Sequence, residues 1–89
     1  MTIDRFFSAS IDHYISVIDL HETDSVHEAL DLLERQLFRL VQEEKLYCRV
    51  VHGIGEGMLA EAVHRALKSH PLVTSWREEP DGGSCLVLL

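Results

Sequence analysis

The sequence predicts an α/β fold, a two-layer sandwich of order β-α-β-α-β-β in which two helices cover one face of a mixed four-stranded sheet. Two stretches with apolar residues at three- and four-residue steps alternate with short runs rich in β-branched residues, so helices connect parallel strands. Only a Gly-rich turn separates the last two runs, which requires them to pair antiparallel. The four predicted strands cover residues 14–20, 46–51, 72–77 and 84–89.

The chain begins with residues 1–13, which show no sustained period and are expected to form an N-terminal arm that can fold back on a domain of residues 14–89. The first strand follows the arm. Ser25 and Glu28 then fit a capping box, in which a hydroxyl and a carboxylate satisfy free amides of the first helical turn. The helix that they start carries an apolar stripe, which consists of Val26, Ala29, Leu30, Leu33, Leu37, Leu40 and Val41.

The second half of the chain repeats the strand and helix pattern. The strand at 46–51 leads through a glycine-rich loop into a helix over 58–69, which ends before Pro71 because proline disfavours helical backbone in the residue before it. The last strand, residues 84–89, is almost continuously apolar. This character predicts burial on both faces or a central position in the sheet.

The composition indicates one globular domain. The chain has 89 residues, of which 46% are hydrophobic and 26% charged. No apolar run is long enough to span a membrane, so we expect a cytoplasmic protein, and the start at Met1 favours a small stand-alone one. Cys48 and Cys85 lack metal-type spacing and are expected to be reduced core residues. The net charge of −7 opposes non-specific binding to nucleic acid, which would need a local basic patch.

The loop between the second strand and the second helix, residues 52–57, reads His-Gly-Ile-Gly-Glu-Gly. Its glycines fit either a tight turn that needs positive φ or a cradle in which backbone amides and the helix N-terminus bind an anion. If the first two strands pair in parallel, their carboxyl ends bring Asp19, His21 and His52 together beside this loop. Asp19 and His21 are then either a local hydrogen-bonded pair or part of a site. Imidazoles, a carboxylate and free amides suit phosphodiester chemistry.

Two motifs resemble those of the Smr (small MutS-related) domain family. Ile18-Asp19-Leu20-His21 is similar to its Leu-Asp-x-His signature, and residues 52–57 match its His-Gly-x-Gly-x-Gly motif. With the Leu-Lys pair that closes the second helix and the final Gly-Gly hairpin, the resemblance covers residues 17–89. Glu22 stands where the family usually has Gly. The resemblance implies the β-α-β-α-β-β fold and, for many members, cleavage of DNA or RNA.

By this resemblance Asp19, His21 and His52 would be catalytic, and Gly53, Gly55 and Gly57 would bind a backbone phosphate. The first hypothesis for function is therefore a nucleic-acid endonuclease that nicks DNA or cleaves RNA. His21 or His52 would act as the general acid or base, and Asp19 would orient a histidine. No cofactor is firmly implied. Two histidines and one aspartate could hold a divalent metal ion, but a strict ligand motif is absent.

Two other functions stay open. The domain could bind DNA or RNA without cleaving it, or it could be a protein-interaction module that uses an exposed apolar or acidic face. The binding hypothesis requires a basic patch. Its expected members are Arg49, Arg65, Lys68 and Arg77.

Overall fold

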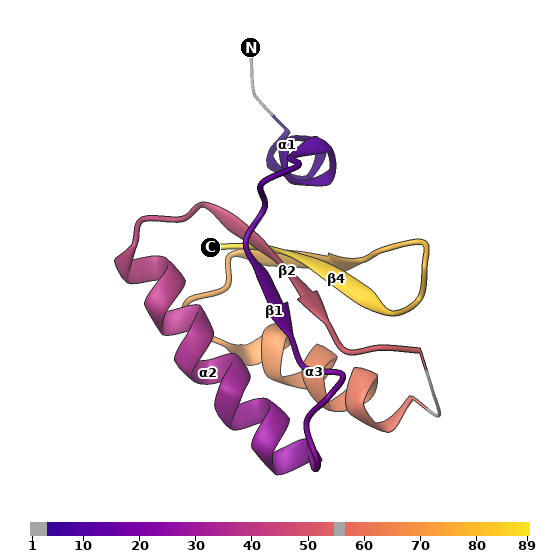
Figure 1. The fold of residues 1–89 in the computed structure, drawn as a ribbon. Helices are drawn as coiled ribbons and strands as arrows, with labels where there is room; N and C mark the ends of the chain where they lie inside the picture. Colours follow the sequence, from indigo (N-terminus) through magenta and orange to yellow (C-terminus); the bar gives the residue numbers. More distant parts are fainter. Residues whose placement is uncertain (1–3, 55–56) are drawn as a thin grey trace.

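The computed structural model describes residues 4–54 and 57–89, and this part of the chain forms three helices and four strands (Figure 1). They are α1 (Arg5–Ile11), β1 (Val17–Asp19), α2 (Val26–Gln42), β2 (Tyr47–Val51), α3 (Met58–Ser69), β3 (Ser75–Glu78) and β4 (Ser84–Leu88). The predicted order is confirmed from β1 onward. β1 and β3 each begin three residues later than predicted, because hydrogen-bonded turns formed by Asp12 with Tyr14, and by His70 with Val73, precede them.

The sheet is mixed, as predicted, and has the strand order β1-β2-β4-β3. β1 pairs with β2 in parallel, whereas β4 pairs antiparallel with both β2 and β3. β4 is therefore a central strand, and all five of its residues are buried. The apolar run at the end of the sequence predicted this position correctly.

α2 and α3 cover one face of the sheet, as predicted (Figure 1). Between these helices and the sheet lies the core, whose central side chains are Leu33, Leu37, Leu40, Val63, Leu67, Cys48, Val50, Cys85 and Val87. Both cysteines are free and buried, as expected. In the described part of the chain, no helix has the length and apolar character needed to cross a membrane.

The capping box at the start of α2 forms with one change of partner. The Ser25 hydroxyl accepts a hydrogen bond from the Glu28 amide at 3.0 Å, as predicted. The Glu28 carboxylate accepts one from the amide of Asp24 at 3.3 Å, rather than from that of Ser25. Both contacts satisfy amides at the helix entry, which fixes where α2 begins.

The N-terminal arm contains a helix that the sequence analysis did not predict. α1 lies on the face of the sheet opposite to α2 and α3 (Figure 1). Asp4 caps it by accepting hydrogen bonds from the amides of Phe6 and Phe7, at 2.9 and 3.3 Å, and Ala9 is fully buried. Seven residues are too few to display an apolar period or to form a stable helix alone, so packing against the sheet holds α1 in place.

Replacing Leu37 of α2 with alanine should lower the free energy of unfolding by about 2–5 kcal/mol, because this fully buried side chain leaves a cavity in the core. Phe38, the next residue along α2, is 55% exposed. Phe38→Ala is therefore the matched control, with an expected change within about 0.5 kcal/mol. Urea denaturation followed by circular dichroism measures both values. Equal losses in the two variants would contradict the packing described for α2.

Candidate functional site

The parallel pairing of β1 with β2 assembles the site. The register aligns Asp19 with Val51, and the amide of Leu20 donates a further hydrogen bond to the carbonyl of Val51 at 2.7 Å. His21 therefore lies beside Gly53. The approach is so close that a Cβ built on Gly53 would lie 3.1 Å from the Cβ of His21. The expected meeting of the two strand ends is confirmed, and glycine is what permits it.

Asp19 and His21 form a hydrogen-bonded pair at this edge. Asp19 Oδ1 accepts a hydrogen bond from His21 Nδ1 and another, at 3.1 Å, from the backbone amide of His21. Both side chains are about half exposed, at 51% and 47%. The side-chain hydrogen bond is the main cause that raises the pKa of His21 above 6.5 and lowers the pKa of Asp19 below 3.8. The pair therefore favours an imidazolium beside a carboxylate.

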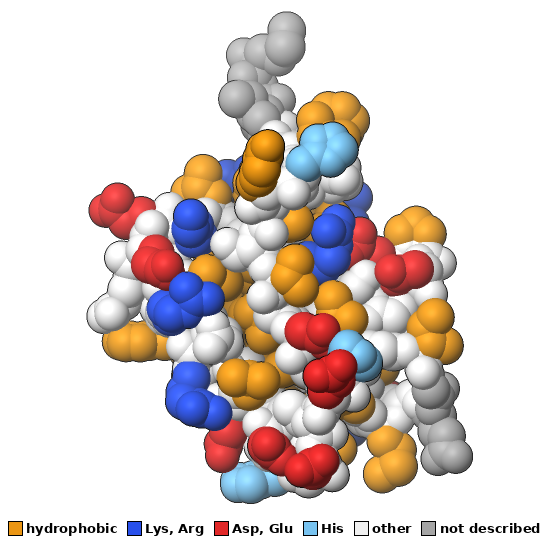
Figure 2. All heavy atoms as spheres, viewed as in Figure 1, with side chains coloured by type: hydrophobic (Ala, Val, Ile, Leu, Met, Phe, Trp, Pro, Cys, Tyr) orange, Lys and Arg blue, Asp and Glu red, His pale blue; other side chains and the backbone are white. Residues whose placement is uncertain are grey.

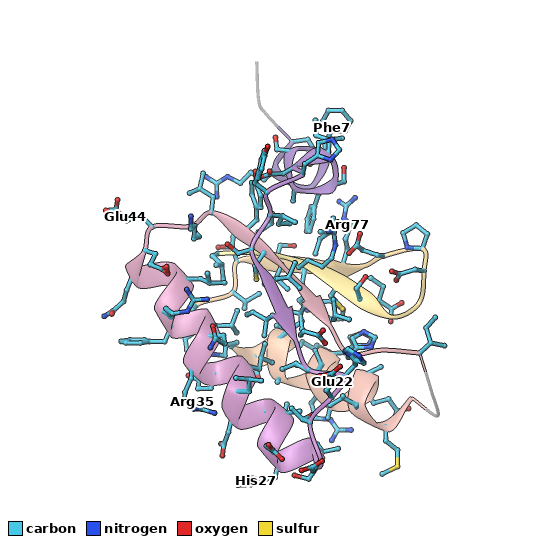
Figure 3. All side chains as sticks on the ribbon, viewed as in Figure 1. Phe7, Glu22, His27, Arg35, Glu44 and Arg77 are labelled. Carbon is cyan, nitrogen blue, oxygen red and sulfur yellow. The ribbon has the colours of Figure 1, made fainter. Side chains whose placement is uncertain are left out.

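The outer nitrogen of His21 faces a second carboxylate. Because Nδ1 binds Asp19, Nε2 is the ring atom left for other partners, and Glu22 Oε1 lies 3.6 Å from it. Glu22 is labelled in Figure 3 just beyond the end of β1. In Figure 2 acidic side chains gather around a histidine in this region of the surface. A substrate anion that approaches Nε2 has to displace or avoid this carboxylate.

The glycine loop packs closely on the β3–β4 turn. The amides of His52 and Gly53 both donate to the carbonyl of Gly83, at 3.0 and 2.9 Å. Gly53 has φ of +85°, and a Cβ on Gly83 would lie 3.1 Å from Cγ1 of Ile54. Gly57 has φ of +88° and caps α3 without a side-chain hydrogen bond. Gly55 lies outside the described residues.

The start of α3 borders a hollow of about 270 Å³. Its lining residues are His52, Gly53, Ile54 and residues 57–60, so it is formed by the glycine loop and the first turn of the helix. The first amides of a helix lack partners within it and carry its positive dipole end. This hollow is consequently suited to an anion.

His52 does not join Asp19 and His21, contrary to our expectation. The register that sets His21 beside Gly53 aligns His52 with Leu20, a core residue, so its side chain points to the opposite face of the sheet. Only 5% of His52 is exposed. His21 instead lines a separate hollow of about 340 Å³ on the other side of the loop. The divalent-ion site of two histidines and Asp19 is likewise not assembled by the described residues.

The imidazole of His52 has two defined neighbours. Its Nδ1 lies 3.0 Å from the carbonyl oxygen of Gly53, to which it donates, and its Nε2 lies 3.7 Å from Sγ of Cys85. Burial raises the pKa of the Cys85 thiol to about 12, so without a metal ion the thiol is neutral and donates to Nε2. His52 thereby holds the first residues of the loop in place.

The expected basic patch is divided between two faces of the molecule. Arg49 and Arg77 both align with Leu86 across the sheet, on the side covered by α1. Arg65 and Lys68 are exposed on α3, which covers the other side. The four cations therefore do not form one surface.

The two arginines of the sheet already have partners. Arg49 Nε and Nη2 donate to the carboxylate of Glu79 at 2.5 and 3.2 Å, a bidentate pair that raises the pKa of Arg49. The guanidinium of Arg77 lies 3.8 Å from the centre of the Phe6 ring, beneath α1 in Figure 3. Both arginines are therefore already engaged in contacts within the chain, which a ligand would have to share or replace.

Sequence reasoning missed His64. Its ring packs edge-on against His52, with centroids 5.4 Å apart, and stacks on Trp76 of β3 at 4.8 Å. The sequence did contain one indication that His64 faces the sheet. It lies four residues after Ala60 and three before Leu67, the spacing of residues on one face of a helix. A histidine at such a position faces the sheet.

Comparison with known proteins identifies the family. The family model described as the Smr domain matches residues 18–89, which is most of the chain. The chain belongs to the Smr domain family. The expected fold and family are therefore both confirmed.

Two relatives illustrate how far the Smr similarity extends. The protein named endonuclease MutS2 from Thermomicrobium roseum is 53% identical over 51 residues, which are 57% of this chain but only 6% of that protein. The crystal structure of the Smr domain of Thermus thermophilus MutS2 superposes with a TM-score of 0.78 at 29% identity, and the match covers 84% of this chain and 98% of that one. The match thus covers a small part of the Thermomicrobium roseum protein and nearly all of the Thermus thermophilus Smr domain.

The Asp19→Asn variant should bring the pKa of His21 back toward 6.5, because it removes the carboxylate that raises it. Folding raises the pKa of His21 and lowers that of Asp19. The pair therefore stabilises the folded protein most between about pH 4 and 6.5. The stabilisation is lost as pH rises through the folded-state pKa of His21. It is also lost as pH falls through the folded-state pKa of Asp19. An NMR titration of the imidazole resonances measures the shift. An unchanged His21 pKa in Asp19→Asn would disprove the assignment of cause.

Proposed function

We propose that this Smr domain is a nucleic-acid endonuclease with Asp19 and His21 as its catalytic residues. The observation that carries the proposal is the exposed Asp19–His21 hydrogen bond beside the glycine loop. Asp19 holds Nδ1, which leaves Nε2–H directed away from the pair. Its raised pKa increases the protonated fraction of His21. As a water molecule, or a 2′-hydroxyl in RNA, forms the new bond to phosphorus, His21 can donate its proton to the leaving oxygen.

The neighbouring hollow supplies the second part of the proposal, a binding site for a backbone phosphate. The amides at the start of α3, together with Gly57, would hold the phosphate oxygens. Gly53 would border this site without donating to it, because its amide is bonded to the carbonyl of Gly83. The role of Gly55, which lies outside the described residues, stays a prediction. His21 and this hollow lie on the two sides of the Gly53–Ile54 backbone, so one strand can cross the loop and contact both. His52, which is buried, would act as a positioning residue through its hydrogen bond to Gly53.

The name of the relative agrees with this chemistry. The Thermomicrobium roseum protein is named an endonuclease, and its similarity to this chain is confined to 51 residues. The step requires an attacking oxygen, from water or from a 2′-hydroxyl of RNA, together with bound phosphate oxygens and a protonated imidazole for the leaving oxygen.

The purified chain should cut supercoiled plasmid or structured RNA, and His21→Ala should slow the cut by about 10²- to 10⁴-fold through loss of the proton donor. Asp19→Asn should also slow it. His27→Ala is the matched control, since this histidine is 88% exposed at the start of α2, away from the pair. Each protein is assayed with and without a chelator. Cleavage by His21→Ala at the wild-type rate would refute the catalytic assignment.

A second candidate function, nucleic-acid binding without cleavage, is favoured by one observation. The Glu22 carboxylate, 3.6 Å from His21 Nε2, occupies the side of the ring that a phosphate must reach. Binding at low salt with no cleavage by wild type would support this candidate over the first.

Replacing Glu22 with glutamine should tighten binding to a nucleic acid by about two- to fivefold at low salt, because it removes a repulsive charge worth up to about 1 kcal/mol at an exposed position. Glu44→Gln changes the net charge equally, and Figure 3 shows Glu44 near the opposite end of α2. Affinities measured by fluorescence anisotropy over a salt series separate the two variants. Equal effects would mean that only the total charge matters, not the place of Glu22.

A further inference from the structure

Behind the glycine loop lies a cluster of three potential metal ligands from three different elements. His52 follows β2, His64 belongs to α3 and Cys85 belongs to β4, and one ligand atom from each lies within 4.8 Å of the others. We propose that these residues bind a Zn²⁺ ion, with Glu78 of β3 as the fourth ligand. The site is distinct from the Asp19–His21 pair and does not depend on the proposed cleavage.

The distance between the ligand atoms of Cys85 and His52 fits a zinc ion. A tetrahedral Zn²⁺ with bonds of about 2.3 Å to sulfur and about 2.05 Å to nitrogen holds those two atoms about 3.6 Å apart. Sγ of Cys85 and Nε2 of His52 are 3.7 Å apart. Sulfur and imidazole ligands select zinc over magnesium or calcium, which prefer oxygen. The donor set thus specifies the class of metal as well as the place.

The imidazole of His52 is already oriented for a metal. Its Nδ1–H donates to the carbonyl oxygen of Gly53, so the lone pair is on Nε2, the nitrogen that faces Cys85. Zinc-binding histidines generally have such a partner on the non-ligating nitrogen. The hydrogen bond fixes both the tautomer and the plane of the ring.

His64 presents a polar atom that lacks a partner. Its Nε2 is buried and makes no hydrogen bond to any described residue. Glu78 Oε1 lies only 3.2 Å away, but not in line for one. Stacking against Trp76 holds the ring in this position. A buried, unpaired nitrogen is costly unless something binds it, and a metal ion would remove that cost.

Glu78 lies next to His64, outside the three-residue cluster, and would supply the fourth ligand after turning toward Cys85. It aligns with Cys85 in the antiparallel β3–β4 pair, so both side chains point to the same face of the sheet. Nitrogen and oxygen ligands of one zinc ion lie about 3.3 Å apart, close to the 3.2 Å between His64 Nε2 and Glu78 Oε1. Four protein ligands make a closed, structural site. Zinc binding would release the thiol proton of Cys85 to solvent.

The metal would join β3, β4, α3 and the end of β2 directly beneath the glycine loop. Zinc added to the metal-free 89-residue chain should raise its melting temperature by about 10–20 °C when the free ion is a hundredfold above Kd. Metal analysis after desalting should give one zinc per chain. Co²⁺ should give the charge-transfer absorption of a thiolate ligand. Asp19→Asn should bind zinc as tightly as wild type, which separates this site from the catalytic pair.

The two cysteines provide a matched comparison, because both are fully buried on central strands and only Cys85 belongs to the cluster. Cys85→Ala should lose at least about a hundredfold in zinc affinity and the cobalt band, whereas Cys48→Ala should keep both. If Cys85→Ala does not fold, His64→Ala, at a partly exposed position, replaces it with the same expected loss.

The proposal is overturned if wild type shows no cobalt–thiolate band, or if Cys85→Ala or His64→Ala binds zinc like wild type. In that case the contact between Cys85 and His52 is only a thiol–imidazole hydrogen bond.

Discussion

The parallel pairing of β1 with β2 is the interaction on which the rest of the site depends. Three aligned residue pairs and two further hydrogen bonds, Leu20 N–H to Val51 O and Arg49 N–H to Ser16 O, fix the register of a strand only three residues long. That register decides which residues share a face at the carboxyl edge. A shift by one residue would exchange the exposed Asp19 for the buried Ile18 and bury the acid–base pair, which the loss of core packing opposes.

The alternation of side chains along a strand gives the edge two chemical environments. His21, aligned with Gly53, faces solvent beside two carboxylates, whereas His52, one residue earlier in the register, faces the core beside a thiol and a second imidazole. Only the backbone of the glycine loop separates them. Gly53 is favoured both by its φ of +85° and by the close approach of the His21 side chain, whereas at Gly83 the exposed Ile54 side chain approaches closely. One loop therefore serves an exposed pair and a buried cluster.

The cations of this acidic chain do not gather on one basic face, and two of them have partners within the fold. Glu79 accepts two hydrogen bonds from Arg49, and Phe6 of α1 lies under Arg77, so both arginines on that face of the sheet have partners in the chain. Attraction of a polyanion would then depend on helix amides, on His21 and on the exposed cations of α3, with Glu22 opposing it. For this reason we expect the charge at position 22 to affect binding more than the net charge does.

The sequence by itself determined the element order, the mixed sheet, the central last strand and which two strand ends meet beside the glycine loop, because hydrophobic period and connection length are local properties. It missed α1, whose seven residues show no period, and it wrongly grouped the four cations into one patch. The tertiary structure decided which side chains share a face. The pairing register puts His52 and His21 on opposite faces of the sheet. Strand pairing and helix packing bring His64 and Glu78, which are distant in the sequence, to the same face as Cys85.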